Sequence, residues 1–278
     1  MSMPVRAERN ITFFSELPRL WALLPVLTWR DLRVRYKQSL LGIGWAVLLP
    51  VAMMLLFTFV FTRAIDGALV LDLHVPYSLY AFAGIVPWTF FSTSLNNCVN
   101  SLVANRALVT KVYFPREVFP LSCIASALVD FAIALLVLAG LVVYFHLRGD
   151  WTFVPTRALL FFPVILVVQT MFIAGLGMLL AMANLFYRDV RQVFSVLIQL
   201  WMFISAVVVP LPQDQSPWAQ MIALNPLVPL ITAYRDAILH GRGPDLAGFI
   251  YTSIVALLLL IFGWISFRRA SFRFAECI

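Results

Sequence analysis

Residues 119–145 read FPLSCIASALVDFAIALLVLAGLVVYF, and this stretch decides the fold. It runs for 27 residues, and Asp130 is its single charged side chain. About 20 consecutive apolar residues are enough for a helix to cross the hydrocarbon core of a bilayer. The apolar residues here are continuous, whereas a strand of a membrane barrel would alternate them with polar residues. The stretch therefore predicts a transmembrane α-helix.

The rest of the chain has the same apolar character on either side of this stretch. Of its 278 residues, 62% are apolar and 12% are charged, and the mean hydropathy is +0.93. A typical soluble domain is about half apolar and about a quarter charged. The sequence therefore predicts an all-α integral membrane protein with six transmembrane helices. The predicted spans lie at about residues 43–61, 79–99, 119–145, 159–184, 193–210 and 249–267.

The basic residues are unevenly divided between the two sides of this six-span arrangement. The formal net charge is +7, and 15 of the 20 lysine and arginine residues fall on the side that holds both chain ends. Because basic loops stay in the cytoplasm, both termini are predicted to be cytoplasmic. Membrane orientation then explains the excess charge, and no nucleic-acid partner is expected. The predicted organisation is a cytoplasmic region 1–42, a transmembrane domain 43–267 and a cytoplasmic tail 268–278.

The region 1–42 contains a helical pattern immediately before the first span. Apolar and aromatic residues recur at helical spacing, while charged residues fall on other sides of the same helix. This pattern predicts an amphipathic interface helix among the lipid headgroups, where basic side chains meet anionic membrane lipid. Anchoring explains the helix, and a role facing the transport path is the alternative. Its apolar side comprises Trp29, Leu32, Tyr36 and Leu40, and its candidate functional residues are Trp29, Arg33, Tyr36 and Lys37.

Residues 104–116, ANRALVTKVYFPR, form the loop between the second and third predicted spans. The loop is too polar to enter lipid, and Pro115 ends a short helix in it because proline cannot continue a helix. Its apolar side chains exceed what a simple tether between spans needs. We therefore favour a docking surface for a partner protein over a basic tether.

The segment before the last span is the longest one on the opposite side. Two short apolar helices, within residues 216–240, are separated by Asn225-Pro226. Each is shorter than a bilayer crossing requires, so they are predicted to enter the outer leaflet and return. A re-entrant backbone is tolerated only beside protein or water, which indicates a transport path nearby.

The chain lacks the motifs that identify a nucleotide-binding protein or a hydrolytic enzyme. No glycine is followed by lysine, so no phosphate-binding loop of the G-x-x-x-x-G-K-[ST] type is present, and neither H-E-x-x-H nor G-x-S-x-G occurs. The three histidines are scattered along the chain. We therefore expect no catalytic, cofactor or metal site in this chain, and any ATP must be bound by another polypeptide.

Two other functional classes follow from the residues and remain open. Asp130, near the middle of a span, suits a proton relay, a pore lining or a contact between helices. An ion-coupled carrier would need a second acid, histidine or lysine at that depth, which makes this class the weaker one. A membrane-embedded enzyme of glycan assembly would need clustered acids or histidines, and residues 187–191, YRDVR, are the densest candidate.

Aromatic residues make up 14% of the chain, and several lie inside the second and fifth predicted spans. Aromatic faces stack on sugar rings while they tolerate apolar neighbours, so such residues suit the wall of a glycan path. Core packing is the alternative explanation for each of them. The candidate path residues are Trp88, Phe91, Asn97, Trp201 and Phe203.

Four stretches together resemble one family. They are residues 30–61 (RDLRVRYKQSLLGIGWAVLLPVAMMLLFTFVF), 82–122 (FAGIVPWTFFSTSLNNCVNSLVANRALVTKVYFPREVFPLS), 185–205 (LFYRDVRQVFSVLIQLWMFIS) and 223–239 (ALNPLVPLITAYRDAIL). In order and spacing they resemble the permease subunits of bacterial polysaccharide ABC exporters. The resemblance implies a homodimer in the bacterial inner membrane with two separate ABC ATPase subunits that bind ATP and Mg²⁺. It also implies a lipid-linked, O-antigen-like polysaccharide as substrate, with capsular polysaccharide and teichoic acid as alternatives.

The same resemblance implies roles for three segments. Residues 104–116 match a coupling loop that docks on the ATPase, the Trp29–Leu40 segment matches a cytoplasmic interface helix, and residues 216–240 match periplasmic gate helices. The implied ATPase contacts are Arg106, Lys111, Tyr113, Phe114, Arg116 and Glu117. The implied gate residues are Trp218, Asn225, Pro226 and Tyr234.

Overall fold

The computed structural model describes residues 13–37, 41–42, 44–64, 75–111, 115–208, 222–272 and 274. Within these ranges all regular structure is helical, as the sequence predicts. The α-helices are α1 (Phe13–Tyr36), α2 (Gly44–Phe59), α3 (Tyr77–Ala104), α4 (Arg106–Lys111), α5 (Val118–Arg148), α6 (Phe162–Phe186), α7 (Val190–Ile204), α9 (Leu227–Arg235) and α10 (Leu246–Ser271). Short π- and 3₁₀-helical turns lie at η1 (Val60–Ala64), η2 (Arg157–Phe161) and η3 (Asp236–His240).

Each of the six predicted spans is a helix, but only some of these helices have the length and composition of a membrane crossing. Within the described ranges four qualify, at Gly44–Thr62, Val118–Arg148, Arg157–Phe186 and Leu246–Ser271. Helix α7 has 15 residues, which at about 1.5 Å per residue is shorter than the hydrocarbon core of about 30 Å. Helix α3 is long enough, and its serine, threonine and asparagine residues lower its hydropathy. Within the described ranges, length and composition therefore support four of the six predicted crossings.

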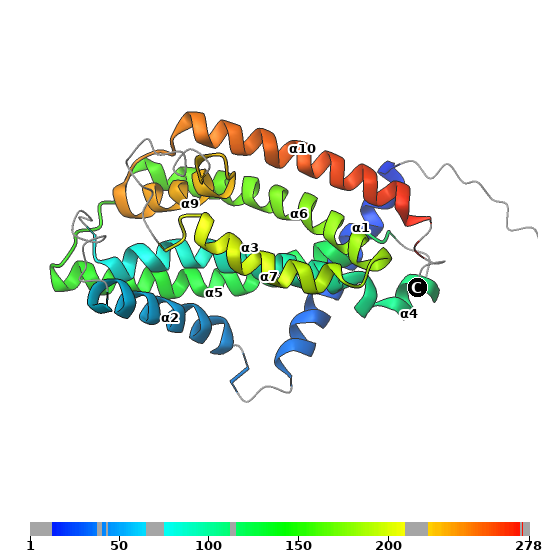
Figure 1. Ribbon diagram of the computed structural model, residues 1–278, viewed down its shortest axis with the longest axis horizontal. Helices are drawn as coiled ribbons and strands as arrows, with labels where there is room; N and C mark the ends of the chain where they lie inside the picture. The colour runs from blue at the N-terminus through cyan, green and yellow to red at the C-terminus, as the bar shows by residue number, and fades with distance from the viewer. Residues whose placement is uncertain are drawn as a thin grey trace, which may run out of the picture.

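Helix α3 is the centre of the bundle. It packs against α5, α6, α2, α7 and α9, and most of its residues are buried. Figure 1 shows α3, α5, α6 and α10 running lengthwise, with α9 at one end of the molecule and α4 at the other. Helix α1 crosses the bundle obliquely and packs on α5. The end with α4 is called the α4 end below, and the other is called the α9 end.

Helices α6 and α10 approach each other closely through glycine. A Cβ atom at Gly175 would lie 2.5 Å from the carbonyl carbon of Leu259, and one at Gly263 would collide with the carbonyl oxygen of Gly175. Small residues allow such backbone contact between helices in lipid, where apolar burial does not drive association. The α6–α10 pair is thereby fixed along the length of the bundle.

Candidate functional site

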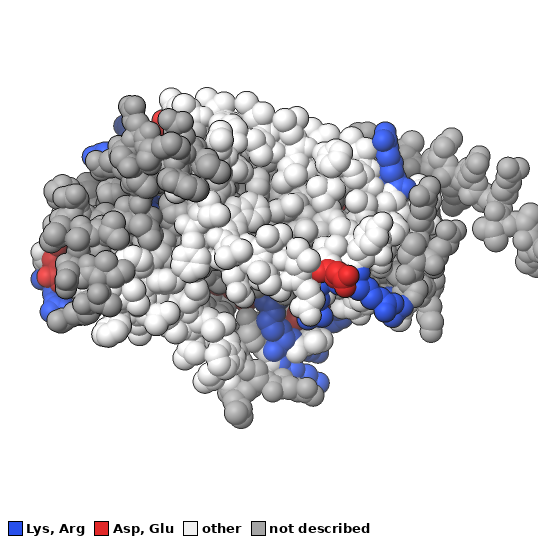
Figure 2. Space-filling view, viewed as in Figure 1, with Lys and Arg blue, Asp and Glu red and all other residues white. Residues whose placement is uncertain are grey.

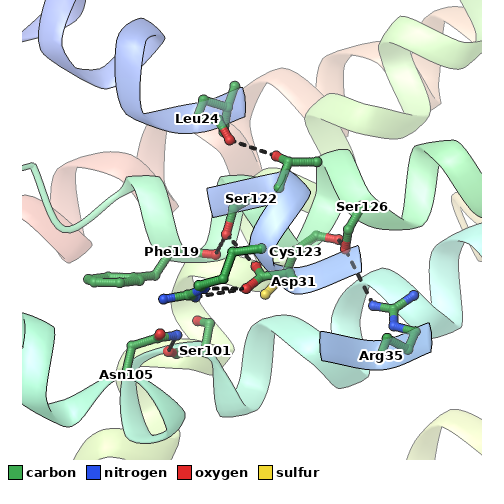
Figure 3. Close-up of polar contacts among 11 residues, drawn as sticks. Leu24, Asp31, Arg35, Ser101, Asn105, Phe119, Ser122, Cys123 and Ser126 are labelled. Atoms are coloured by element: carbon green, nitrogen blue, oxygen red, sulfur yellow. Dashed lines mark hydrogen bonds and ion pairs between the residues drawn. The ribbon is translucent and has the colours of Figure 1, made fainter. Parts of the chain in front are cut away.

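The first part of the site is a polar contact between α1 and α5. Ser122, Ser126 and Asp130 recur every four residues on α5, so they share one face of that helix. On α1, the facing side chains are Asp31 and Arg35, which are also four residues apart. Figure 3 shows the Asp31, Arg35, Ser122 and Ser126 side chains directed toward one another from the two helices.

The contacts along this face are direct hydrogen bonds. Ser122 Oγ donates to the Asp31 carboxylate at 3.0 Å, and the Arg35 guanidinium donates to Ser126 Oγ at 3.3 Å. Arg35 also forms an ion pair with Asp130, and the Tyr36 hydroxyl donates to the other Asp130 oxygen. The polar stripe of α5 is therefore satisfied by α1, which precedes the first predicted span.

These contacts account for the charge within the long apolar stretch. The side chain of Asp130 is 17% exposed, and a carboxylate at that depth is costly unless it is paired. Burial, followed by the hydrogen bond to Asp130, raises the pKa of Tyr36 to about 12. The phenol therefore stays protonated at neutral pH and donates to Asp130. The geometry favours the interpretation of Asp130 as a helix contact over a proton relay.

The prediction for α1 was incomplete. Tyr36 lies beside Trp29 and Leu32, as the helical spacing predicts, and its hydroxyl also donates to Asp130 of α5. Trp29 is 63% exposed, as expected for the side of an amphipathic helix that faces lipid. The sequence pattern also gave no sign that the polar side of α1 packs against a protein helix rather than facing water.

A cavity of about 280 Å³ lies next to this contact, between α2, α3, α5 and the end of α1. Thr89, Thr93 and Asn97 recur every four residues along α3 and line it, with Arg35 and Asp130 at the same cavity. The Asn97 amide nitrogen is buried and has no hydrogen-bond partner within the described ranges. Unpaired buried donors are rare in proteins, so this amide is suited to a ligand or to water. The remaining lining is mostly apolar or aromatic and includes Trp45 and Phe90.

The candidate path residues are not all brought together. Asn97 lines the cavity, whereas Trp88 and Phe91 are buried in the core, with ring centroids 5.5 Å apart. Phe91 also meets Trp201 edge to face at 5.4 Å. Phe203 lies on α7 and is 64% exposed. Within one chain, the Trp88, Phe91 and Trp201 rings therefore form a packed cluster, as the alternative of core packing predicts.

At the α9 end, Asn225 joins α7 to the start of α9. Its amide nitrogen donates to Ser205 Oγ at 2.9 Å, and its amide oxygen accepts from the Trp201 indole at 3.2 Å. The same oxygen accepts from the backbone N–H of Leu227, so Asn225 also caps the turn into α9. Pro226 is the N-cap residue of α9. The second of the two predicted short helices corresponds to α9, while Trp218 and most of the first one lie outside the described residues.

Tyr234, another predicted gate residue, is buried inside the bundle. Its ring meets Phe162 at 5.2 Å and Phe131 at 6.3 Å, in edge-to-face geometry. Its hydroxyl oxygen has no hydrogen-bond partner among the described residues. Tyr234 therefore packs α9 against α5 and α6 rather than lining an opening.

Arg235 is a buried residue that the sequence analysis did not identify as functional. The side chain is 3% exposed and donates to the backbone oxygens of Ala206 and Val207, which lie just after α7. It also donates to the backbone oxygen and the hydroxyl of Tyr80, and its guanidinium carbon lies 3.8 Å from the centre of the Tyr80 ring. A Cβ atom at Gly84 would collide with the guanidinium, so the glycine leaves room for it.

The backbone held by Arg235 is unusual. Ala206 has φ of +51°, in the left-handed region that alanine rarely adopts. Arg235 binds the carbonyl groups of Ala206 and Val207, which lie just beyond the last residue of α7. Arg235 therefore fixes the end of α7 to α3 and α9. In the sequence, the only indication of this buried role was the position of an arginine within a short apolar helix.

The α4 end contains the predicted coupling loop. Helix α4 (Arg106–Lys111) is present, Arg106 is exposed on it, and Val109 is buried against the bundle. Tyr113, Phe114 and the side chain of Lys111 lie outside the described residues.

The residues that follow the loop are tied to the end of α10. Glu117 is 4% exposed and forms an ion pair with Arg268 at 2.9 Å, so its carboxylate turns into the chain rather than toward a partner protein, contrary to the expectation. The Arg116 guanidinium lies 5.8 Å from the ring of Phe274, and that ring packs on Phe267 of α10. These contacts connect the residues that follow the loop to the end of α10.

The YRDVR stretch, the candidate for an enzyme of glycan assembly, lies largely on the surface in the part of the chain that the structure describes. Tyr187 of the YRDVR stretch is 74% exposed in the turn between α6 and α7. Among the described residues, no group of three or more histidine, cysteine or acidic side chains is placed to hold a metal ion.

Comparison with known proteins defines the class. The family of ABC-2 type transporters matches residues 22–239, and the chain belongs to this family. It is 33% identical over 271 residues to the O-antigen export system permease protein RfbA of Myxococcus xanthus, covering 96% of this chain and all of that protein. An O-antigen export system permease protein RfbA of Klebsiella pneumoniae is 29% identical over 281 residues, 99% of this chain and all of that protein. The polysialic acid transport protein KpsM of Escherichia coli is 23% identical over 242 residues, 86% of this chain and 90% of that protein.

Proposed function

We propose that this chain is the membrane permease subunit of an ABC exporter that moves a lipid-linked, O-antigen-like polysaccharide out of the cytoplasm. The observation that carries the proposal is the 33% identity to an O-antigen export permease over 96% of this chain and the whole of that relative. Two O-antigen permeases are more similar to this chain than the polysialic acid transport protein is, which favours an O-antigen-like polymer over a polysialic-acid capsule.

In the proposed assembly, two copies of this chain sit in the bacterial inner membrane with both termini in the cytoplasm. Six helices of each copy, α2, α3, α5, α6, α7 and α10, would lie within the bilayer, and α9 would form a re-entrant gate at the outer face. Two ABC ATPase subunits would supply ATP and Mg²⁺ binding. The chain itself would be no enzyme, in keeping with its lack of a phosphate-binding loop.

The contacts suggest how the conformational change driven by ATP would be transmitted to the membrane helices. The ATPase would dock on α4 and on the 104–116 loop, with Arg106, Lys111 and Arg116 supplying positive charge. Glu117 and Arg268 would pass the movement to α10, whose close glycine contact with α6 makes the two helices move together. A bound partner shifts such an equilibrium only if it binds the two conformations with different affinity.

A glycan would meet the hydroxyl and amide stripe of α3. Thr89, Thr93 and Asn97 offer hydrogen bonds to sugar hydroxyl groups, while the nearby aromatic side chains offer apolar faces. The Asn97 amide, which lacks a partner among the described residues, is the first group we expect to contact the polymer.

Complementation tests the proposal. The chain should restore surface polysaccharide to a strain whose own O-antigen permease gene is deleted, provided that its ATPase partner is supplied as well. Arg106→Glu with Lys111→Glu should abolish the restoration while membrane insertion persists, and Arg148→Glu with Arg242→Glu at the α9 end is the matched control. Restoration without any ATPase, or an unaffected Arg106→Glu/Lys111→Glu variant, would contradict the proposal.

A further inference from the structure

A second hollow lies on the other side of the end of α1. Its volume is about 440 Å³, and it is formed by residues 29–37, at the end of α1, against α5. The side chains of α5 make an apolar floor of Val129 and Ile133. The side chains of α1 make a basic and aromatic rim, which comprises Trp29, Leu32, Arg33, Tyr36 and Lys37.

The charges on α1 are divided between its two sides. Arg30 pairs with Asp31 at 2.7 Å, and Arg35 pairs with Asp130. Arg33 and Lys37, by contrast, form no ion pair with any acid in the part of the chain that the structure describes. Figure 2 shows basic side chains gathered where α1 ends, next to the uncharged flank of α2. Arg33 and Lys37 both border the hollow.

The spacing of these cations favours a shared anion. Arg33 and Lys37 are four residues apart, so they are neighbours on the helix surface, and their like charges repel each other. The Arg33 guanidinium lies 5.7 Å from the centre of the Trp29 ring, which keeps it beside the hollow. A phosphate between the two cations would accept charge-assisted hydrogen bonds from both.

We propose that this hollow binds one anionic phospholipid of the inner leaflet, with its phosphate between Arg33 and Lys37 and one acyl chain on Val129 and Ile133. A site with cations at the rim and aliphatic side chains below has the two-part chemistry of a lipid at the membrane surface. Trp29, exposed beside it, is the residue type that prefers the headgroup level. The inference rests on the proposed cytoplasmic placement of α1, and it does not depend on which polymer is exported.

Lipid bound in this hollow would influence the 280 Å³ cavity through Tyr36, which contacts both. Its side chain lines both hollows, with the 280 Å³ cavity on one side and the lipid site on the other. The bound lipid would hold the last turn of α1 against α5 and so stabilise the Tyr36–Asp130 hydrogen bond. Tyr36 and Lys37 would then be positioning residues for the cavity, not groups that touch the polymer.

Native mass spectrometry of the purified full-length chain tests the proposal, with dioleoylphosphatidylglycerol and dioleoylphosphatidylcholine as probes. The chain should retain one phosphatidylglycerol with at least tenfold higher affinity than phosphatidylcholine. Arg33→Gln with Lys37→Gln should remove at least tenfold of the phosphatidylglycerol affinity. Arg188→Gln with Arg191→Gln, which removes two exposed arginines from the α6–α7 turn, is the matched control and should change the affinity less than twofold.

A second variant protects the test against misfolding of the charge variant. Ile133→Trp fills the floor of the hollow and leaves both cations in place, so it should also weaken retention of phosphatidylglycerol about tenfold. Equal retention of the two lipids, or an equal loss in the Arg188/Arg191 control, would overturn the proposal. Displacement of phosphatidylglycerol by equimolar undecaprenyl phosphate would overturn the choice of a phospholipid and assign the site to the polymer's lipid carrier. Polysaccharide export by the wild-type chain, scored separately, distinguishes failure of this site from failure of the proposed function.

Discussion

The buried arginine at the α9 end offers the most decisive test of how the bundle is held together. Arg235→Met keeps the length of the side chain and removes its donors and its charge. The backbone oxygens of Tyr80, Ala206 and Val207 would then lose their partner. A buried acceptor left without a partner costs about 1–3 kcal/mol.

The three acceptors together set an upper range of about 3–9 kcal/mol, before any relaxation. Two effects reduce this range, because burying a cation itself carries a desolvation cost and hydrogen bonds between helices in lipid are individually modest. We therefore expect a loss of about 3 kcal/mol. For a chain of this size, about 2–4 °C of melting temperature is lost per kcal/mol, which gives a decrease of about 6–12 °C.

The assay is thermal unfolding of the purified chain in one detergent, followed by intrinsic tryptophan fluorescence. Arg242→Met is the matched control, because Arg242 is an exposed arginine at the same end of the molecule, and it should shift the melting temperature by less than about 2 °C. The melting temperature of Arg235→Lys should lie between those of Arg235→Met and Arg242→Met, since a lysine retains the charge without the planar fork of donors. A melting temperature for Arg235→Met that matches the Arg242→Met control would refute the role assigned to Arg235.

Three further predictions concern the helix contacts. Glu117→Arg should lower the free energy of unfolding by about 2 kcal/mol, because it breaks the ion pair with Arg268. In a double-mutant cycle, the swap Glu117→Arg/Arg268→Glu should recover at least half of this loss, and no recovery would argue against the pair. Asp130→Asn should release Arg35 and the last turn of α1, so hydrogen exchange at residues 31–36 should rise about tenfold, whereas Asp150→Asn, at an exposed pair, should leave it unchanged. Gly263→Val should cost about 1–3 kcal/mol by forcing α10 away from α6, while Gly140→Val, at a glycine with open space around it, should cost clearly less; equal costs would contradict the glycine contact.

The helices of this protein were predictable from local sequence because their apolar runs are long and continuous. The stretch 119–145 became α5 (Val118–Arg148), and the final run 249–267 became α10 (Leu246–Ser271), each within four residues at either end. The number of crossings was less predictable. Helix α3 carries polar residues that line a cavity, and α7 ends early because the chain turns at Ala206 to meet Arg235.

The side-chain contacts of the site were mostly hidden because they join residues far apart in the chain. Asp130 was identified as a buried charge that needs a partner, yet its partners Arg35 and Tyr36 are more than 90 residues away. Helical periodicity assigns residues to sides of a helix but does not say which side meets protein and which meets lipid. Arg235 shows the same limit, since a basic residue in an outer segment is usually solvated and here is buried.

The central claim is that this chain transports a lipid-linked polysaccharide only when a separate ABC ATPase drives it. Reconstitution of the purified chain in liposomes, with and without the candidate ATPase, measures this directly as ATP-dependent transfer of a labelled lipid-linked glycan across the bilayer. The account predicts transfer only when both proteins and hydrolysable ATP are present. Transfer by this chain alone, or equal transfer with an ATPase that cannot hydrolyse ATP, would contradict it.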